Sequence, residues 1–185
     1  MRVFHVDLLS RFGSSMREIS LTYPGWSIGR ACWDTYGIFE PLFGLKPLKK
    51  LHYTGEVAFD RNILERRLAT SWPGVGALSI PCIVGPALPY DALPVIALGF
   101  PRLTDLTMPV VFPESYVLPH EQILQHGLRK CSSPETSVEW LTCTARYLDH
   151  IFPFLMRVEG GSGWDQVEQI ILEACQPIRR HPRHR

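Results

Sequence analysis

Residues 59–84, FDRNILERRLATSWPGVGALSIPCIV, contain the pattern on which the expected fold depends. Asp60, Asn62 and Glu65 begin a short helix, which a Pro-Gly pair ends before a β-rich run closed by IPCIV. Arg66 and Arg67 follow Glu65 directly. The first helical turn offers unpaired N–H groups and a positive dipole end, and guanidinium groups bind phosphate oxygens in pairs. The segment therefore predicts a phosphate site and indicates nucleotide or nucleic-acid chemistry.

The composition is that of one folded domain with almost no net charge. The chain has 185 residues, of which 45% are hydrophobic, and a formal net charge of +1. A core can therefore form, and a protein that coats duplex DNA by bulk charge is disfavoured. The five cysteines are widely spread without metal-site spacing, which favours free thiols over a disulfide framework. We expect a single domain over residues 1–176 and a basic tail over residues 177–185.

Sixteen prolines and fourteen glycines limit the middle of the chain to short elements. Strands dominate the first two thirds and helices the last third, which favours an α+β fold with a C-terminal helical cap. No internal repeat is recognised. Residue types between turn signals predict strands at 1–9, 18–22, 39–45, 51–59, 78–84, 94–100 and 109–112. Apolar periodicity predicts helices at 27–36, 62–72, 119–129, 134–154 and 164–175.

Three short motifs, in this order and spacing, resemble those of the ParB/sulfiredoxin superfamily. Residues 36–42, YGIFEPL, resemble its HG(I/V)xxPL-like segment, and a GERRxxA-like helix and an (I/V)PxIV-like strand follow. The matching residues are Gly37, Pro41 and Leu42, then Glu65, Arg66, Arg67 and Leu68, then Ile80, Pro81, Ile83 and Val84. The resemblance covers residues 27–84 and implies a ParB/sulfiredoxin-like mixed sheet with short helices.

Within this superfamily the chain is similar to plasmid fertility inhibition factors. That resemblance implies ATPase and DNase activity used to block conjugative or type IV secretion DNA transfer. It implies ATP and a divalent metal, Mg²⁺, as cofactors, with DNA and a protein of the secretion or conjugation machinery as partners. It also implies the bacterial cytoplasm, with peripheral association at the inner membrane as an alternative. No stretch approaches the roughly 20 apolar residues of a membrane-spanning helix.

The expected site residues have roles that follow from their chemistry. Asn62 caps the helix and Glu65 closes an N-x-x-E box, so Glu56 or Asp60 is at least as good a candidate for holding metal or water. The expected catalytic residues are Glu65, Arg66, Glu56 and Asp60. The expected cofactor-binding residues are Asn62, Arg66 and Arg67, and the expected DNA contacts are Lys49, Lys50, Arg179 and Arg180. The alternative for the arginine helix is a solvated basic face, and for each carboxylate an ordinary exposed acid.

A second function stays open on the same fold. Leu64 stands where the superfamily has glycine before its ERR motif. A side chain there would obstruct close approach of a triphosphate to the backbone. The alternative is a non-catalytic binding protein that inhibits a secretion ATPase or a DNA-processing complex by contact.

Overall fold

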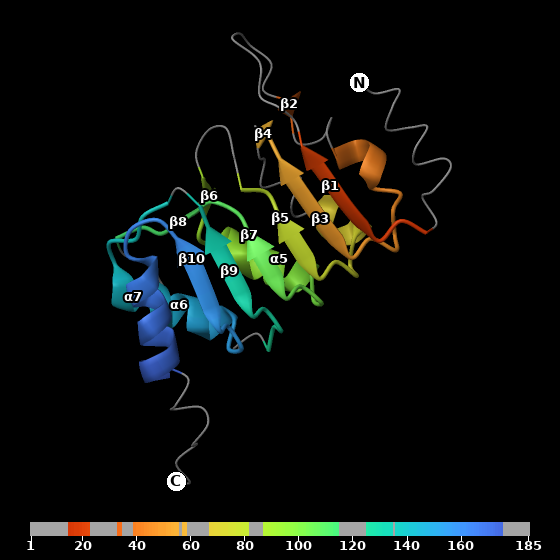
Figure 1. The fold of residues 1–185 in the computed structure, drawn as a ribbon. Coiled ribbons are helices and arrows are strands. Elements are labelled where there is room, and N and C mark those ends of the chain that lie inside the picture. Colours follow the sequence, from red (N-terminus) through yellow and green to blue (C-terminus); the bar gives the residue numbers. More distant parts are fainter. Residues whose placement is uncertain are drawn as a thin grey trace.

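Six strands form one sheet in which each strand lies beside the next one along the chain (Figure 1). The computed structural model describes residues 15–22, 33–34, 39–55, 57–58, 67–81, 87–114, 125–134 and 136–175. The strands, in order across the sheet, are β1 (Glu18–Thr22), β3 (Lys50–Thr54), β5 (Ala77–Ser79), β7 (Asp105–Thr107), β9 (Lys130–Ser133) and β10 (Arg157–Gly160). Each described pairing is parallel. A fold with both strands and helices is confirmed. We expect the sheet to mix parallel and antiparallel strands, but all its described pairs are parallel.

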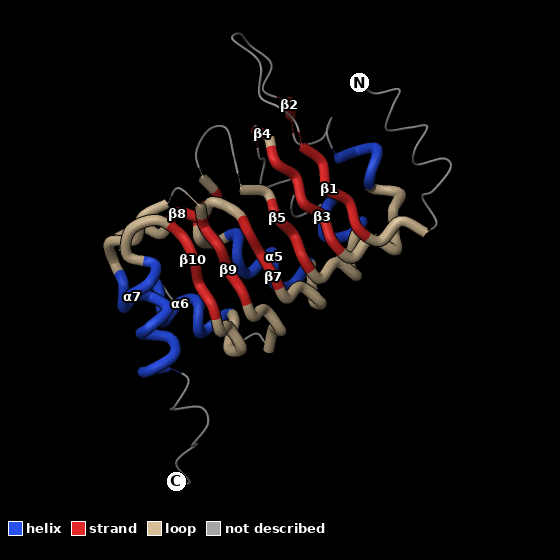
Figure 2. The backbone as a smooth tube through the Cα atoms, in the orientation of Figure 1, coloured by secondary structure: helices blue, strands red, loops and turns tan. Residues whose placement is uncertain are grey.

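The topology places the helices on one face of this sheet. Parallel neighbours need a crossover between them, and such crossovers are right-handed. Because the chain always moves to the next position in the same direction, each crossover returns on the same side. Accordingly α4 (Ala69–Ser71), α5 (Ala92–Gly99) and α6 (Leu141–Ile151) cover one face, while α7 (Trp164–Ile170) packs beside β10 at the end (Figures 1 and 2). The opposite face of the sheet is not covered by any of these helices.

The buried side chains repeat from unit to unit, which corrects the expectation of no internal repeat. Each unit buries positions i, i+3 and i+5, which are apolar except for Ser133, and this is the spacing of the L-x-x-L-x-L pattern of leucine-rich solenoids. No side chain in the first four sets is more than 3% exposed. The sets are Leu48, Leu51 and Tyr53; Val75, Leu78 and Ile80; Leu103, Leu106 and Met108; Leu128, Cys131 and Ser133. Leu155 and Val158 begin a fifth set, so the chain stacks strand-and-connection units, as solenoids do.

A doubled hydrogen bond marks the start of each unit. The amides of Lys49 and Lys50 both donate to the Arg17 carbonyl, with N···O distances of 2.6 and 3.0 Å. The same pair of bonds recurs at the next units, with acceptor carbonyls on Lys49, Gly76, Thr104 and Arg129. These acceptors are about 25 to about 32 residues apart along the chain, close to the period of leucine-rich repeats. The bonds fix the register of each strand against the preceding one.

Shorter strand pairs continue the stacking beyond the sheet. β2 (Trp33–Asp34) pairs in parallel with β4 (Val57–Ala58), and β6 (Leu88–Pro89) with β8 (Val110–Val111). Each pair joins the segments that follow two adjacent sheet strands. Neighbouring units therefore contact each other at two levels.

Two segments predicted as strands form helical turns. Residues 94–100 lie mainly in α5, and residues 39–45 include the 3₁₀ turn η1 (Glu40–Leu42). In both, a proline lies in the first turn, where its missing N–H has no intrahelical partner to lose. Periodicity alone does not separate a buried helix from a strand in such short apolar runs.

Two segments predicted as helices contain extended chain. Residues 33–34 form β2 within the predicted helix 27–36, and residues 125–129 are not helical and lead into β9. β9 and β10 also lie in the last third of the chain, where we expect helices to dominate and predict no strand. Pairing with the preceding unit outweighs the weak strand preference of their lysine, arginine and serine residues.

The prediction is confirmed at both ends of the sheet. β1 has the predicted bounds, and the predicted helix 164–175 contains α7 and the π-helical turn η3 (Ile171–Cys175). The predicted helix 62–72 ends in α4, while its residues before 67 and the predicted strand 1–9 lie outside the described residues. No helix in the described part of the chain has the length and hydropathy of a membrane span.

His126 closes the turn before β9 in its neutral form. Its ring is buried, Nε2 lies 2.8 Å from the Phe100 carbonyl oxygen, and Nδ1 accepts the Leu128 amide at 3.2 Å. Nε2 must carry the proton in this arrangement. Burial lowers the pKa of His126 from its ordinary value, although the hydrogen bond to the Phe100 carbonyl opposes this.

The protein is therefore expected to lose stability when pH falls below about 6.5. The lowered pKa means that the unfolded chain takes up a proton there before the folded one does, so acid favours unfolding. Urea unfolding followed by circular dichroism from pH 8 to pH 5 measures the slope, which His126→Gln should reduce. Equal slopes in both proteins would contradict a neutral buried imidazole.

Candidate functional site

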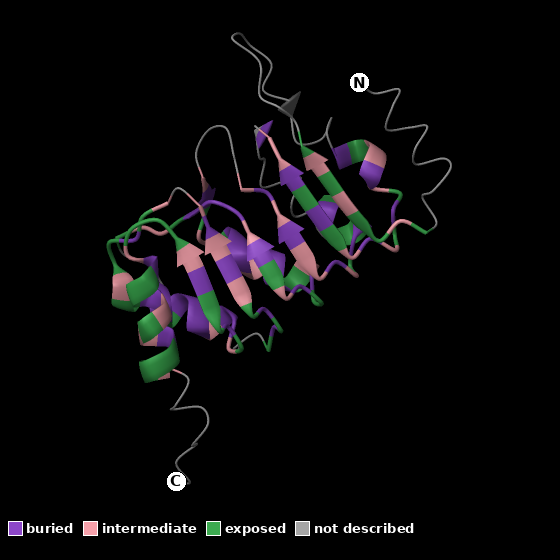
Figure 3. Cartoon of the chain, in the orientation of Figure 1, coloured by how far each residue is buried: buried purple, intermediate pink, exposed green. Residues whose placement is uncertain are grey.

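The face of the sheet away from the helices presents two rows of mainly polar side chains. Along each strand these residues alternate with the buried ones, as the period of two requires (Figure 3). The strand register aligns the first row as Glu18, Lys50, Ala77, Asp105, Lys130 and Arg157. It aligns the second row as Ser20, His52, Ser79, Thr107, Ser132 and Glu159. We call these two rows the open face.

Ion pairs join charged side chains on the open face, two of them between neighbouring strands and one within β10. Lys50 Nζ lies 2.9 Å from Glu18 Oε1, and Lys130 Nζ lies 2.9 Å from Glu159 Oε2. Arg157 Nε lies 2.6 Å from the other oxygen of Glu159. The hydrogen bond from Lys130, followed by the charges of Lys130 and Arg157, lowers the pKa of Glu159. Exposed pairs of this kind contribute about 0 to 1 kcal/mol each, so their main effect is to orient the charged groups.

His52, the second residue of the second row, joins strands β3 and β5. Its Nδ1 lies 2.9 Å from Ser79 Oγ, and its Nε2 lies 2.8 Å from Thr54 Oγ1. A neutral imidazole has one donor and one acceptor nitrogen, so one hydroxyl donates to the ring and the other accepts from it. Both bonds hold the exposed ring in one orientation.

Asp105 is the acidic residue nearest the middle of the first row. Its Oδ2 accepts a 2.7 Å hydrogen bond from the Thr104 hydroxyl, and its side chain is exposed. Ala77 stands beside it in the register and offers no polar group. The middle of the first row is therefore sparsely occupied, between an ion pair on one side and a three-residue ionic group on the other.

The structure describes three of the residues that the sequence predicts for the site. Arg67 is exposed, and its carbonyl accepts a 3.0 Å bond from the Thr70 hydroxyl. Lys50 is engaged with Glu18 on the open face, and Lys49 is half-buried beside Gly74. The remaining predicted residues lie outside the described part: Glu56, Asp60, Asn62, Glu65, Arg66, Arg179 and Arg180. A shared site around Arg67 thus stays a prediction.

The residues of the open face, apart from Lys50, are missing from the sequence-based prediction. Their signal is a mainly polar residue at positions i+2 and i+4 of each unit, where i, i+3 and i+5 are the buried positions. That signal is visible only once the units are aligned with one another. No group of three or more His, Cys, Asp or Glu residues suited to a metal ion occurs among the described residues.

A scan against models of known protein families found no match, and a search of curated proteins found none. The function must therefore be inferred from the fold and the open face.

Proposed function

We propose that this chain is a non-catalytic repeat protein that binds a protein partner through the open face of its sheet. The observation that carries the proposal is the one-sided architecture: the described helices α4, α5 and α6 cover one face of the sheet, and aligned, mainly polar rows occupy the other. Solenoids of stacked units use such extended surfaces to bind other molecules. The short strands and fixed register make the surface rigid, which lowers the entropic cost of binding.

The charge of the open face favours a protein over a nucleic acid. Its two rows hold three cations, Lys50, Lys130 and Arg157, and three carboxylates, Glu18, Asp105 and Glu159. A phosphate backbone is uniformly negative and gains most from a surface of one sign. A partner with charges of both signs complements the alternating rows better.

This function is the second of the two that the sequence predicts. A secretion ATPase or a DNA-processing complex is a proposed identity for the partner. Hydrolysis of ATP and cleavage of DNA remain predictions, because the four residues expected to catalyse them lie outside the described part of the chain.

Site-specific photo-crosslinking in the source cells tests the proposed binding face. A benzophenone amino acid replaces Ser79 or Thr107 on the open face, and Leu98 or Arg146, both exposed on the helices, in the matched controls. We expect both open-face positions to yield the same adduct, at least tenfold above the controls. The crosslinked protein is then identified and purified, and Ser79→Trp should weaken its binding at least tenfold while Leu98→Trp leaves it unchanged. Adducts from the helix positions alone, or equal yields from all four, would contradict the proposal.

A further inference from the structure

Most described lysines and arginines gather at one end of the sheet. They lie at the first residue of a strand or within three residues before it, where the doubled hydrogen bonds are made. We call this group the basic rim: Arg17, Lys49, Lys50, Arg102, Arg129, Lys130 and Arg157. Among the described residues, only Lys46, Arg67 and Arg146 carry such a charge elsewhere.

Fewer acidic residues than basic ones lie where the strands begin. In the described part of the chain, Glu18, Asp105 and Glu159 accompany the basic rim, and Glu168 reaches the start of β10, where its Oε2 accepts the Val158 amide at 2.7 Å. Asp91, Glu114, Glu139 and Asp165 instead occur in the segments that follow the strands. The sheet is therefore positive where its strands begin, although the whole chain carries a formal net charge of only +1. Such a local field attracts a segment of opposite charge and speeds its association.

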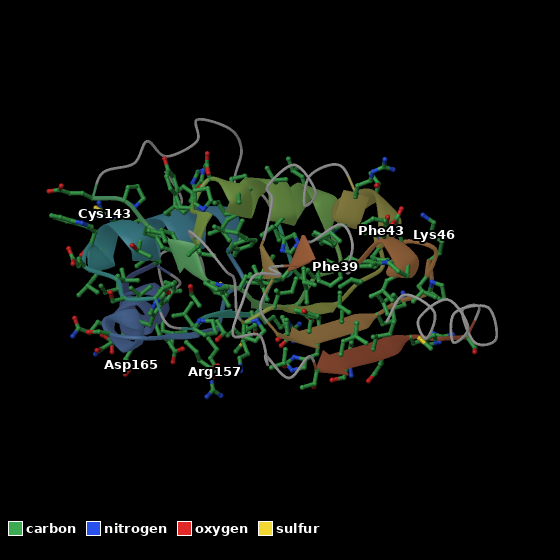
Figure 4. All side chains as sticks on the ribbon, turned by 90° about the horizontal axis from the view of Figure 1, so that it is seen from above. Phe39, Phe43, Lys46, Cys143, Arg157 and Asp165 are labelled. Carbon is green, nitrogen blue, oxygen red and sulfur yellow. The ribbon has the colours of Figure 1, made fainter. Side chains whose placement is uncertain are left out.

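Several cations of the rim have donors to spare. Lys50 and Lys130 each contact a carboxylate, but Arg17, Arg102 and Arg129 have no ion-pair partner within the described ranges. Arg157 gives only Nε to Glu159. The terminal nitrogens of its guanidinium remain available for a carboxylate, and Figure 4 shows Arg157 extending from the side of the sheet away from α5 and α6. Two parallel N–H···O bonds from this fork would make a directional contact.

Exposed apolar side chains adjoin these cations at the start of β10. Phe154 is 56% and Met156 59% exposed. The Met156 amide donates to the Arg129 carbonyl at 2.8 Å, which places Met156 beside Arg129. We call Arg129, Lys130, Phe154, Met156 and Arg157 the β9–β10 corner. Aromatic residues, methionine and arginine are the types enriched in protein interfaces.

From this corner we infer that the partner presents an acidic segment with at least one large apolar side chain. The carboxylates of the segment pair with Arg129 and Arg157, and its apolar side chain covers Phe154 and Met156. The inference rests on the proposed function, since it names the chemistry of the one part of that partner that meets the β9–β10 corner, at the end of the open face where the strands begin. A continuous polyanion fits less well, because Glu18, Asp105 and Glu159 interrupt the rim and would each repel a phosphate.

A displayed library of random 12-residue peptides, panned on the purified full chain, tests the inference without knowledge of the partner. We expect the selected peptides to be enriched in Asp and Glu together with Leu, Phe or Trp. The best synthetic peptide should bind at least tenfold more weakly to Arg129→Glu/Arg157→Glu and to Phe154→Ala/Met156→Ala. Arg146→Glu on α6 is the matched control and should bind like the wild type. Circular dichroism melts establish that each variant is folded before its affinity is compared.

Several results would overturn the inference. These are selected peptides that are neutral or basic, charge-reversal variants that retain full affinity, or a 20-nucleotide single strand that binds more tightly than the best peptide. Because the peptide measurements do not depend on crosslinking, the two proposals fail separately. Adducts at Ser79 and Thr107 with no acidic preference would remove the inference and leave the binding function. Absence of those adducts would remove the binding function itself.

Discussion

Replacing Trp164 by alanine is expected to lower the free energy of unfolding by about 3 to 5 kcal/mol. The indole is fully buried, and its ring centroid lies 5.8 Å from that of Phe112. Its Nε1–H donates to the Thr136 carbonyl at 3.0 Å, and the ring fills the space where a side chain at Gly160 would lie. The substitution therefore opens a cavity and leaves a carbonyl without its donor.

The loss should be local in its first stages, because stacked units are held chiefly by their immediate neighbours. Hydrogen exchange should accelerate in β10 and α6 much more than in β1 and β3. Trp164→Phe is the control: it keeps most of the burial and should cost roughly 1 to 2 kcal/mol. An equal rise in exchange across all six strands would contradict this view of the fold.

Trp72→Ala should also cost about 3 to 5 kcal/mol, at the other end of the sheet. Trp72 is fully buried, and its Nε1–H donates to the Leu42 carbonyl at 3.0 Å. Phe39 and Phe43 contact the ring with centroid distances of 6.2 and 5.9 Å, and Figure 4 shows both on the segment around η1. The tryptophan thus ties this segment to the unit that contains β5.

Urea unfolding followed by circular dichroism measures the change without relying on tryptophan fluorescence. Trp140→Ala is the matched control, because Trp140 is 39% exposed, and its replacement should change stability by less than roughly 1 kcal/mol. Similar losses in the two variants would show that the indole of Trp72 does not anchor η1.

The elements that could be predicted from sequence are those with strong local signals. Glu18–Thr22 alternates polar and apolar residues as a half-buried strand does, and Trp164–Ile170 has an apolar face with an acidic first turn. Residues 94–100 read as a strand because Pro94, Val95 and Ile96 begin a short apolar run, yet most of them lie in the helix Ala92–Gly99. Packing of this segment against the buried face of the sheet favours a helix instead.

The repeat was hard to detect because its buried positions tolerate different residues. Cys131 and Ser133 take places that Leu and Met occupy in the preceding unit, and Tyr53 takes the same place as Ile80. The connections also differ in length, so no fixed period aligns the units along the sequence. The alignment of one unit with the next is set by parallel strand pairing between residues far apart in the sequence. Local strand propensity carries no information about that pairing.

The open face could not be predicted for the same reason. His52 and Ser79 are 27 residues apart in the chain, yet their side chains are 2.9 Å apart. Lys130 and Glu159 likewise meet only because β9 and β10 are adjacent. The predicted phosphate site, by contrast, used contiguous residues and so followed the local pattern of residues 59–84.

The doubled hydrogen bonds at the strand starts have a consequence for how such a chain can change. Each unit is held to the preceding one by two hydrogen bonds to a single carbonyl. Insertions or deletions between these carbonyls can therefore be accommodated on the helical side without shifting the register of the sheet. Substitutions on the open face likewise leave the buried apolar sets untouched. The chain can therefore alter its recognition surface one side chain at a time, and lengthen its connections independently, while the scaffold keeps its register.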